Sequence, residues 1–333
     1  MEMKLLMKLL ILGSSLSFLS ETTANAMINR SSSKIINPLT PNETRVRADL
    51  MDTIKNEATL RRIAPINARI DEIWKAIPGY NGIEIDVEKT YELNKGVIHL
   101  SAIQYLYKEI KPQISLGNLG AQPIHRGNPS KPLVSFMINV AWGNEYLPHI
   151  REVLKKHHAK TTFFLDGSWL KKNIDLAKDI AAEGHELSNH AYSHKNMSQL
   201  DRAQAIREIT RTEQLLVSNL NVRNTLFAPP SGDFDMETVK IAKELNLKTI
   251  LWTLDTVDWR NPTPQSIVQK IENNIKPGYL ILMHPTKSSS QALDEMITVI
   301  ERKGLRLGTV SEVISESRVP NQEALKNSSQ IEE

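Results

Sequence analysis

The sequence predicts an α/β protein, in which a large domain of parallel strands covered by helices follows a smaller α+β domain. Three observations favour this architecture. The chain has 333 residues, 40% of them apolar, which is enough for a sizeable core. Apolar strands alternate with amphipathic helices after residue 132, as is typical of βαβ units. A Pro-, Gly- and Asn-rich connector, "GAQPIHRGNPSKP" (Gly120–Pro132), contains the predicted linker 121–132 and separates this pattern from a different one before it.

The first 26 residues have the pattern of an export signal. Lys4 and Lys8 precede the apolar run Leu9–Leu19, and the small-residue sequence Ala24-Asn25-Ala26 follows, so we expect cleavage after Ala26. The alternative is an uncleaved membrane anchor. This run is, however, well short of the roughly 20 apolar residues that span a bilayer.

Residues 27–45 are polar and predict a flexible segment, and residues 46–120 predict the small α+β domain. Apolar residues with helical spacing begin near Leu50. From Ile83 to Val87 apolar and acidic residues alternate, which is the pattern of a half-buried strand.

Residues 133–318 form the predicted parallel domain, and residues 319–333 a disordered polar tail. Repeated βα units leave open whether the sheet closes as a barrel or is doubly wound. Helices such as Asp201–Asn219 carry their apolar residues on one face. The expected strands are Leu133–Ile138, Thr161–Leu165, Glu186–Ser188, Thr225–Phe227, Thr249–Thr253 and Tyr279–Met283.

Charge and cysteine content exclude several classes of function. The 41 basic and 38 acidic residues give a net charge of +3, and they are spread rather than gathered into a basic stripe. We therefore expect no nucleic-acid partner, while attraction to an anionic wall or membrane surface stays open. Without cysteine there are no disulfides and no thiolate metal sites.

The residues that follow parallel strands gather at one face of such folds, where barrel enzymes place their sites. The residues at these positions are therefore the candidates for chemistry and for substrate binding. They are Asn139, Trp142, Asp166, His190, His194, Pro229, Pro230, Ser231, Asp255, Asp258, Trp259 and His284.

Three of these groups suggest particular chemistry, each with a structural alternative. His190 and His194 would face one side of a helical turn and bind one zinc or cobalt ion, or they form a packed pair. His284 beside Asp255 or Asp258 would donate a proton near neutral pH, or it is a core histidine and the aspartates cap helices.

The rigid turn "APPSGDF" is the third group. A backbone N–H in it, that of Ser231 or Gly232, would stabilise an oxyanion. Alternatively the stretch is only a structural turn, because Pro-Pro and Ser-Gly are common turn formers.

Taken in order, these stretches resemble the polysaccharide deacetylase family, the carbohydrate esterases of the Nod-factor-deacetylase type. The resemblance covers roughly residues 122–315 and includes "IAAEGHELSNHAYSHKNMSQL", "LFAPPSGDF", "LWTLDTVDW" and "GYLILMHPTKSSSQALDEMI". It is strongest to a spore-former subgroup with a small N-terminal extension. It implies a distorted (β/α) barrel, a divalent metal, and N-deacetylation of glycans.

The resemblance also assigns roles to residues. It implies that His190 and His194 bind the metal, that His284 is the general acid, that Asp255 and Asp258 tune it, and that the Ser231 N–H binds the oxyanion. Aligning Trp142-Gly143 with the family's Trp-Gly puts Asn139 at the catalytic base, Val140 at the metal aspartate and Ala228 at the arginine that tethers the base.

These three departures fall in the half of the site that makes the nucleophilic water. An Asn amide cannot accept a proton, and general-base catalysis is typically worth about 10²–10⁴ in rate. Two neutral histidines without a carboxylate should bind metal weakly. Glu145 and Asp166 are nearby candidates for a replacement base.

Two functions follow from this reading. The first is an exported N-deacetylase of peptidoglycan or a related N-acetylated wall polymer. The second is a catalytically silent module that binds glycan or wall at the same place, with Trp142, Pro229, Pro230 and Trp259 in contact with the sugar and Trp169 as a further stacking candidate. Hydrolysis of a different C–N or ester bond is a third possibility, which no particular residue supports.

Overall fold

The computed structural model describes residues 41–96 and 100–319. Contacts divide the chain between Asp49 and Leu50, and the second unit contains the strands and the candidate site. The predicted export signal, most of the segment 27–45 and nearly all of the tail 319–333 lie outside the described residues. Val319 is an exception, because it is buried in an apolar cluster with Val310 and Val313 and so belongs to the domain.

The parallel domain is built on one sheet with the strand order β10-β11-β5-β6-β7-β8-β9, and β12 also pairs with β5. Every pairing in it is parallel. This confirms the predicted α/β class and five of the six expected strands. The sixth, Thr249–Thr253, is wrong in its bounds, because β9 ends at Thr249 and residues 251–253 are not in a strand. Its strands are β5 Leu133–Val140, β6 Thr162–Leu165, β7 Glu186–Asn189, β8 Leu226–Phe227, β9 Lys248–Thr249, β10 Leu254–Asp255, β11 Leu280–Met283 and β12 Arg306–Leu307.

Two strands, β10 and β12, were not expected from the sequence. Each has only two residues, too few to give a periodic pattern. β10 lies inside the "LWTLDTVDW" stretch and ends beside β11.

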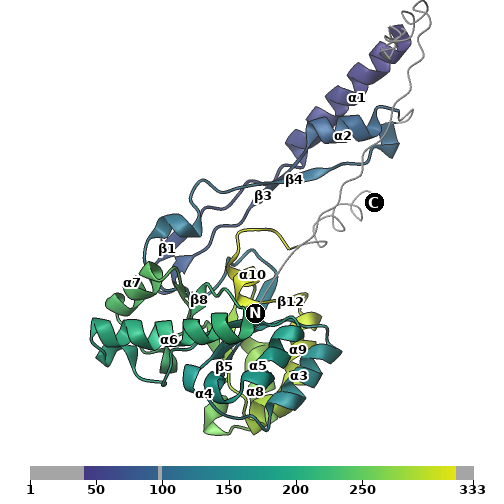
Figure 1. The fold of residues 1–333 in the computed structure, drawn as a ribbon. Helices are drawn as coiled ribbons and strands as arrows, with labels where there is room; N and C mark the ends of the chain where they lie inside the picture. Colours follow the sequence, from purple (N-terminus) through teal and green to yellow (C-terminus); the bar gives the residue numbers. More distant parts are fainter. Residues whose placement is uncertain (1–40, 97–99, 320–333) are drawn as a thin grey trace, which may run out of the picture. The chain divides into compact units, whose positions relative to one another are not determined.

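Helices cover the outer face of this sheet, and their caps fix where they begin. α6 starts after Asp201, whose carboxylate accepts the Gln204 N–H, and ends at Asn221 in a left-handed conformation, close to the prediction. Figure 1 shows α3, α8 and α9 grouped on one flank of the sheet. The helices are α3 Leu147–Lys156, α4 Gly167–Lys172, α5 Ile174–Ala182, α6 Arg202–Leu220, α7 Met236–Glu244, α8 Pro264–Asn274, α9 Lys287–Arg302 and α10 Val310–Ile314.

β5 pairs with three strands, β6, β11 and β12, and all eight of its side chains are buried. Alternate residues face opposite sides. Val134, Phe136 and Ile138 pack in the cluster that contains the helix residues of α3, α8 and α9, whereas Leu133 and Met137 belong to a second cluster with residues of β8, β11 and α10.

Residues before the linker form two small antiparallel sheets and two helices, an α+β composition as expected. Val87 begins α2 rather than extending the strand, because the Asp86 carboxylate caps the helix by accepting the Lys89 N–H. α1 begins at Pro41, inside the segment expected to be flexible. The elements are α1 Pro41–Leu60, β1 Arg69–Asp71, β2 Lys75–Ile77, β3 Gly82–Ile85, α2 Val87–Asn94, β4 Tyr107–Ile110, and the short helices η1 Leu100–Ala102 and η2 Leu116–Leu119.

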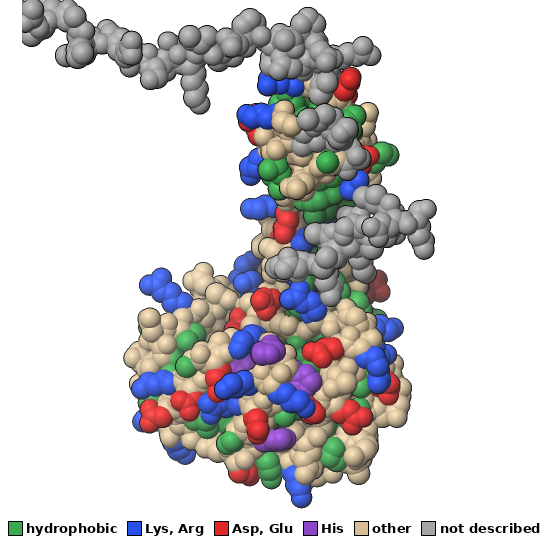
Figure 2. Space-filling view, turned by 90° about the vertical axis from the view of Figure 1, so that its right-hand side faces the viewer, with side chains coloured by type: hydrophobic (Ala, Val, Ile, Leu, Met, Phe, Trp, Pro, Cys, Tyr) green, Lys and Arg blue, Asp and Glu red, His purple; other side chains and the backbone are tan. Residues whose placement is uncertain are grey.

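The distribution of charge on the surface agrees with the even spread of basic and acidic residues in the sequence. Figure 2 shows basic and acidic side chains interspersed on the face it presents, without a stripe of one sign. Of the helices in the described part of the chain, none is both long and apolar enough to cross a membrane.

Candidate functional site

The end of β5 supplies one amide and no carboxylate. Val140 is 0% exposed and belongs to the apolar cluster that holds Phe136 and Ile138 on its side of the strand. Asn139 is also buried, and its Oδ1 has no hydrogen-bond partner. The two positions that the resemblance assigns to carboxylates therefore hold a neutral polar group and a packed aliphatic one.

The Trp-Gly step after β5 brings Trp142 onto His284. Gly143 has φ 84°, and a Cβ at this position would lie 2.1 Å from the carbonyl oxygen of Pro285, so no other residue fits there without a shift. This close approach lets the Trp142 indole stack on the His284 imidazole, with ring centroids 5.7 Å apart and planes 14° apart.

His190 and His194 come together through a loop, not through the helical turn that their spacing predicts. Ala191 and His194 have left-handed backbone conformations, φ 56° and 53°. The loop places the two imidazole centroids 5.2 Å apart. Sequence spacing thus predicted the proximity but gave the wrong local structure.

The His190 ring is fixed and neutral. Its Nδ1 lies 2.7 Å from the carbonyl oxygen of Ala228, so Nδ1 carries the proton and Nε2 is the nitrogen left for a ligand. Complete burial, and then the nearby His194, lower the pKa of His190 to about 3.

Glu208 supports this loop, and sequence reasoning missed it. Its buried carboxylate on α6 accepts the backbone N–H of Tyr192 and of Ser193 at 3.2 and 2.8 Å, and also binds the Ser193 hydroxyl. Its position offered a signal, because Glu208 lies three residues after Ala205 on the apolar face of α6, where a charged residue needs a partner.

The histidine pair does not fit a resident metal ion. Catalytic zinc sites have three protein ligands and structural ones four. Here the donor set is two imidazoles, and the position that the resemblance assigns to the third ligand holds Val140. Within residues 41–96 and 100–319, no group of three or more His, Cys, Asp or Glu side chains is arranged to hold a metal.

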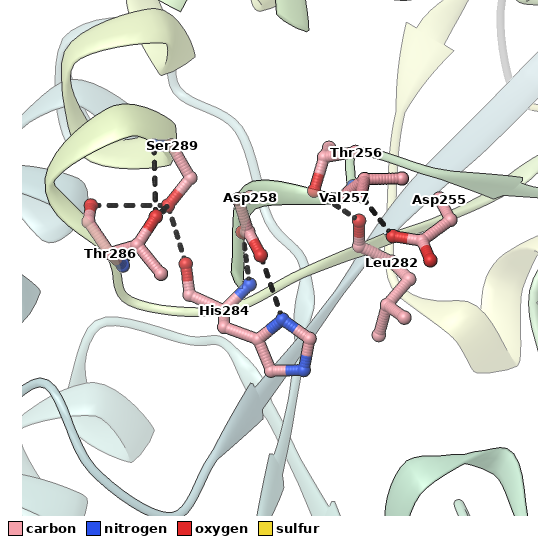
Figure 3. Close-up of polar contacts among 8 residues, drawn as sticks. All are labelled: Asp255, Thr256, Val257, Asp258, Leu282, His284, Thr286 and Ser289. Carbon is pink, nitrogen blue, oxygen red and sulfur yellow. Dashed lines mark hydrogen bonds and ion pairs between the residues drawn. The ribbon is translucent and has the colours of Figure 1, made fainter. Parts of the chain in front are cut away.

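Asp258 holds His284 from two sides, as Figure 3 shows. Asp258 begins the short helix η5 (Asp258–Arg260) and is completely buried. Its carboxylate accepts the His284 backbone N–H at 2.6 Å and lies 2.9 Å from Nδ1. The proton is therefore on Nδ1 facing the carboxylate, and Nε2 is the nitrogen that can meet a ligand.

Asp255 has a different task from the one expected. Its carboxylate accepts the Val257 N–H at 2.7 Å, which holds Val257 at φ 57°, an unusual conformation for a β-branched residue. In Figure 3 its side chain lies apart from the His284 ring. Of the two aspartates, Asp258 is the one that contacts the histidine.

The two candidate replacement bases differ in their surroundings. Asp166 caps α4: its Oδ1 accepts the Trp169 N–H and the Ser168 hydroxyl, while its buried Oδ2 has no hydrogen-bond partner. Burial raises the pKa of Asp166. Glu145 is an exposed residue of the turn before α3.

The Pro-Pro turn is rigid, but its prolines offer no surface. Pro229 and Pro230 are buried, so they fix the turn rather than contact a sugar, in contrast to our expectation. Ser231, in the short helix η4 (Pro230–Gly232), is exposed and has φ 57°. Ala228, at the position that the resemblance assigns to the tethering arginine, is buried.

Two of the three candidate tryptophans present a surface. Trp142 is 46% exposed and Trp259 is 50% exposed, with the Arg260 guanidinium 4.6 Å from the Trp259 ring centroid. Trp169 is only 4% exposed, and its Nε1 donates to Asn144 Oδ1 at 2.6 Å. The idea that Trp169 stacks on a sugar is therefore wrong.

Comparison with known proteins places this arrangement in a family. The family model for polysaccharide deacetylases matches residues 126–250. The uncharacterized protein YlxY of Bacillus subtilis is 41% identical over 276 residues, which are 83% of this chain and 86% of that protein. A peptidoglycan-N-acetylglucosamine deacetylase of Bacillus cereus is 34% identical over 52% of this chain and 65% of its own length.

The similar solved structures include a pseudoenzyme. A pseudoenzyme of carbohydrate esterase family 4 (CE4) from Bacillus anthracis is 44% identical, with a TM-score of 0.73 over 81% of this chain and 96% of that one. A mutant of the same pseudoenzyme, described as having restored enzymatic activity, is 42% identical, with a TM-score of 0.73 over 81% of this chain and 99% of that one. These neighbours share the distorted barrel that the resemblance implied.

Proposed function

This chain belongs to the polysaccharide deacetylase family, and we propose that it is an exported member that binds an N-acetylated glycan of the peptidoglycan type without hydrolysing it. One observation carries the proposal. β5 ends in Asn139 and the completely buried Val140, where hydrolysis needs two carboxylates.

The missing groups are those that activate water. The Asn139 amide cannot take a proton from water, which removes a contribution of about 10²–10⁴ in rate. The remaining imidazoles, His190 and His194, do not form a three-ligand metal set. A zinc or cobalt ion therefore has no part in the proposed function.

The rest of the site, formed by Trp142, Trp259 and His284, is suited to binding. Trp142 and Trp259 expose indole faces on which the apolar face of a sugar ring can stack. His284, held by Asp258, has its Nε2 available for a hydrogen bond with an acetamide. The proposed ligand is therefore recognised by its ring face and its N-acetyl group.

Export follows from the N-terminal pattern of the sequence, which supports a location in the cell envelope or outside the cell. The name of the Bacillus cereus relative, peptidoglycan-N-acetylglucosamine deacetylase, supports peptidoglycan as the glycan. So does the name of another relative, a peptidoglycan-N-acetylmuramic acid deacetylase of Bacillus subtilis that is 26% identical over 59% of this chain. A role in sporulation rests on the subgroup resemblance alone.

One observation favours a second candidate, an active N-deacetylase with Asp166 as the base. The Asp166 Oδ2 is unpartnered and its pKa is raised, and a base works best when its pKa approaches the working pH. Against this, its Oδ1 is engaged as the cap of α4, which restricts how the carboxylate can move.

The two candidates separate in one experiment. The purified chain is incubated with peptidoglycan and with chitin oligomers, and acetate release and glycan binding are measured with zinc, with cobalt and with chelator. Binding without acetate release is expected. Acetate release that is lost in Asp166→Asn would overturn the proposal in favour of the second candidate, and absence of binding to either glycan would refute both.

A further inference from the structure

A cavity separate from the deacetylase-like site lies where η2 and the linker meet α7 and β9. Its volume is about 250 Å³, slightly below the usual range for small-molecule sites. Buried or half-buried apolar side chains form much of its wall, namely Ala76, Leu116, Leu119, Ile124, Val239 and Leu247. None of the candidate residues of the deacetylase-like site lines it.

The charged residues of this cavity have one sign. Lys243 and Lys248 line it, and no Asp or Glu does. Within the described ranges neither lysine forms an ion pair. The two glutamates of α7 that bracket Lys243, Glu237 and Glu244, both bind Arg202 instead.

Thr249 is an independent sign of a ligand. It lines the cavity, is 2% exposed, and its Oγ1 is buried without a hydrogen-bond partner. An unpaired buried hydroxyl is costly, and proteins tolerate such groups mainly where they have a use. The Thr249 C=O, by contrast, accepts the Ile124 N–H of the linker at 2.9 Å.

We propose that this cavity binds a small organic carboxylate with an apolar body, such as an N-acylated amino acid or the free C-terminus of a short peptide. The apolar wall takes the body of the ligand. The carboxylate accepts a hydrogen bond from the Thr249 hydroxyl and is attracted by Lys243 and Lys248. This binding is independent of the proposed glycan function.

The test uses the whole chain and a matched pair of probes, N-acetyl-leucine and its uncharged analogue N-acetyl-leucinamide, followed by NMR titration of the backbone amides. The carboxylate should shift the signals of residues 246–249 and bind at least about 10-fold more tightly than the amide. Equal affinity of the two probes, or no shift at these residues, would overturn the proposal.

Three variants test the roles of Lys248 and Thr249 separately. Lys248→Gln should weaken binding about 2- to 5-fold, whereas Lys240→Gln, on α7 but not in the cavity wall, should leave it unchanged. Thr249→Val has the same shape and removes the unpaired hydroxyl, so it should raise the melting temperature and yet weaken carboxylate binding about 10-fold. If Thr249→Val is more stable and yet binds N-acetyl-leucine as tightly as the unmodified chain, the role of the hydroxyl is refuted. If Lys248→Gln and Lys240→Gln change the affinity equally, the site itself is refuted.

Peptides with and without a free C-terminal carboxylate distinguish the two possible sources of the ligand. Binding of N-acetyl-leucine alone would assign the cavity to a free acyl-amino acid. Binding of the free-acid peptide as well would assign it to a chain end. If neither N-acetyl-leucine nor the peptide binds and glycan binding is intact, the cavity proposal is refuted and the proposed function is not affected.

Discussion

Replacing Asn139 and Val140 together by aspartate tests whether the end of β5 alone has silenced the site. Val140→Asp places a carboxylate in an apolar cluster at a position that is completely buried. Without a bound cation this should destabilise the domain by about 3–5 kcal/mol. For a domain of this size the melting temperature should fall by about 2–4 °C per kcal/mol.

Zinc should reverse much of this loss. The new carboxylate would complete a set of three ligands with His190 and His194. At a concentration 100 times its dissociation constant, zinc would then stabilise the folded state by about 2.7 kcal/mol. Asn139→Asp restores a proton acceptor, so acetate release should rise by about 10²–10⁴ over the unmodified chain.

The assay combines thermal unfolding with and without zinc and acetate release from peptidoglycan. Val140→Asn is the matched control, since it is equally polar but uncharged, and it should lose stability without a comparable gain from zinc. The restored activity reported for a mutant of the similar pseudoenzyme makes the experiment feasible. A folded double variant that zinc neither stabilises nor activates would refute the alignment of β5, or would make the arginine missing at Ala228 decisive.

Three further predictions concern single side chains. Trp142→Ala should weaken glycan binding about 10-fold or more with little change in stability. Trp169→Ala should instead lower the free energy of unfolding by about 3–5 kcal/mol, measured by thermal unfolding. Equal effects of the two variants on glycan binding would contradict the stacking model. Asp258→Ala should destabilise the domain by about 1–3 kcal/mol, because it leaves buried donors unpaired, and Asp255→Ala should cost clearly less in the same denaturant titration. Burial lowers the pKa of Lys131 to about 8, below its ordinary value. The folded state therefore binds fewer protons than the unfolded state between about pH 8 and 10.5. As the pH rises over that range, the free energy of unfolding of the unmodified chain should increase by up to about 3 kcal/mol relative to Lys131→Met, and a stability difference that does not change with pH would refute the shift.

The sequence alone predicted the main strands and the candidate residues that follow them. Hydrophobic patterning places β5, β6, β7 and β11 because each is a buried apolar run bounded by polar turns. Parallel strands carry the residues after them to one face, so the sequence predicts that His190, His194 and His284 gather there. The absence of carboxylates at Asn139 and Val140 is likewise a fact of sequence.

Tertiary structure decided what each side chain does. Whether Asp255 or Asp258 holds His284 depends on a left-handed residue at Val257, which local propensity disfavours. Whether a tryptophan is a platform or a core residue depends on what packs against it, so Trp142 and Trp169 look alike in the sequence and differ in exposure. Glu208 and the cavity at Thr249 involve groups far apart along the chain, and burial, which removes the competing water, is a property that only the folded molecule has.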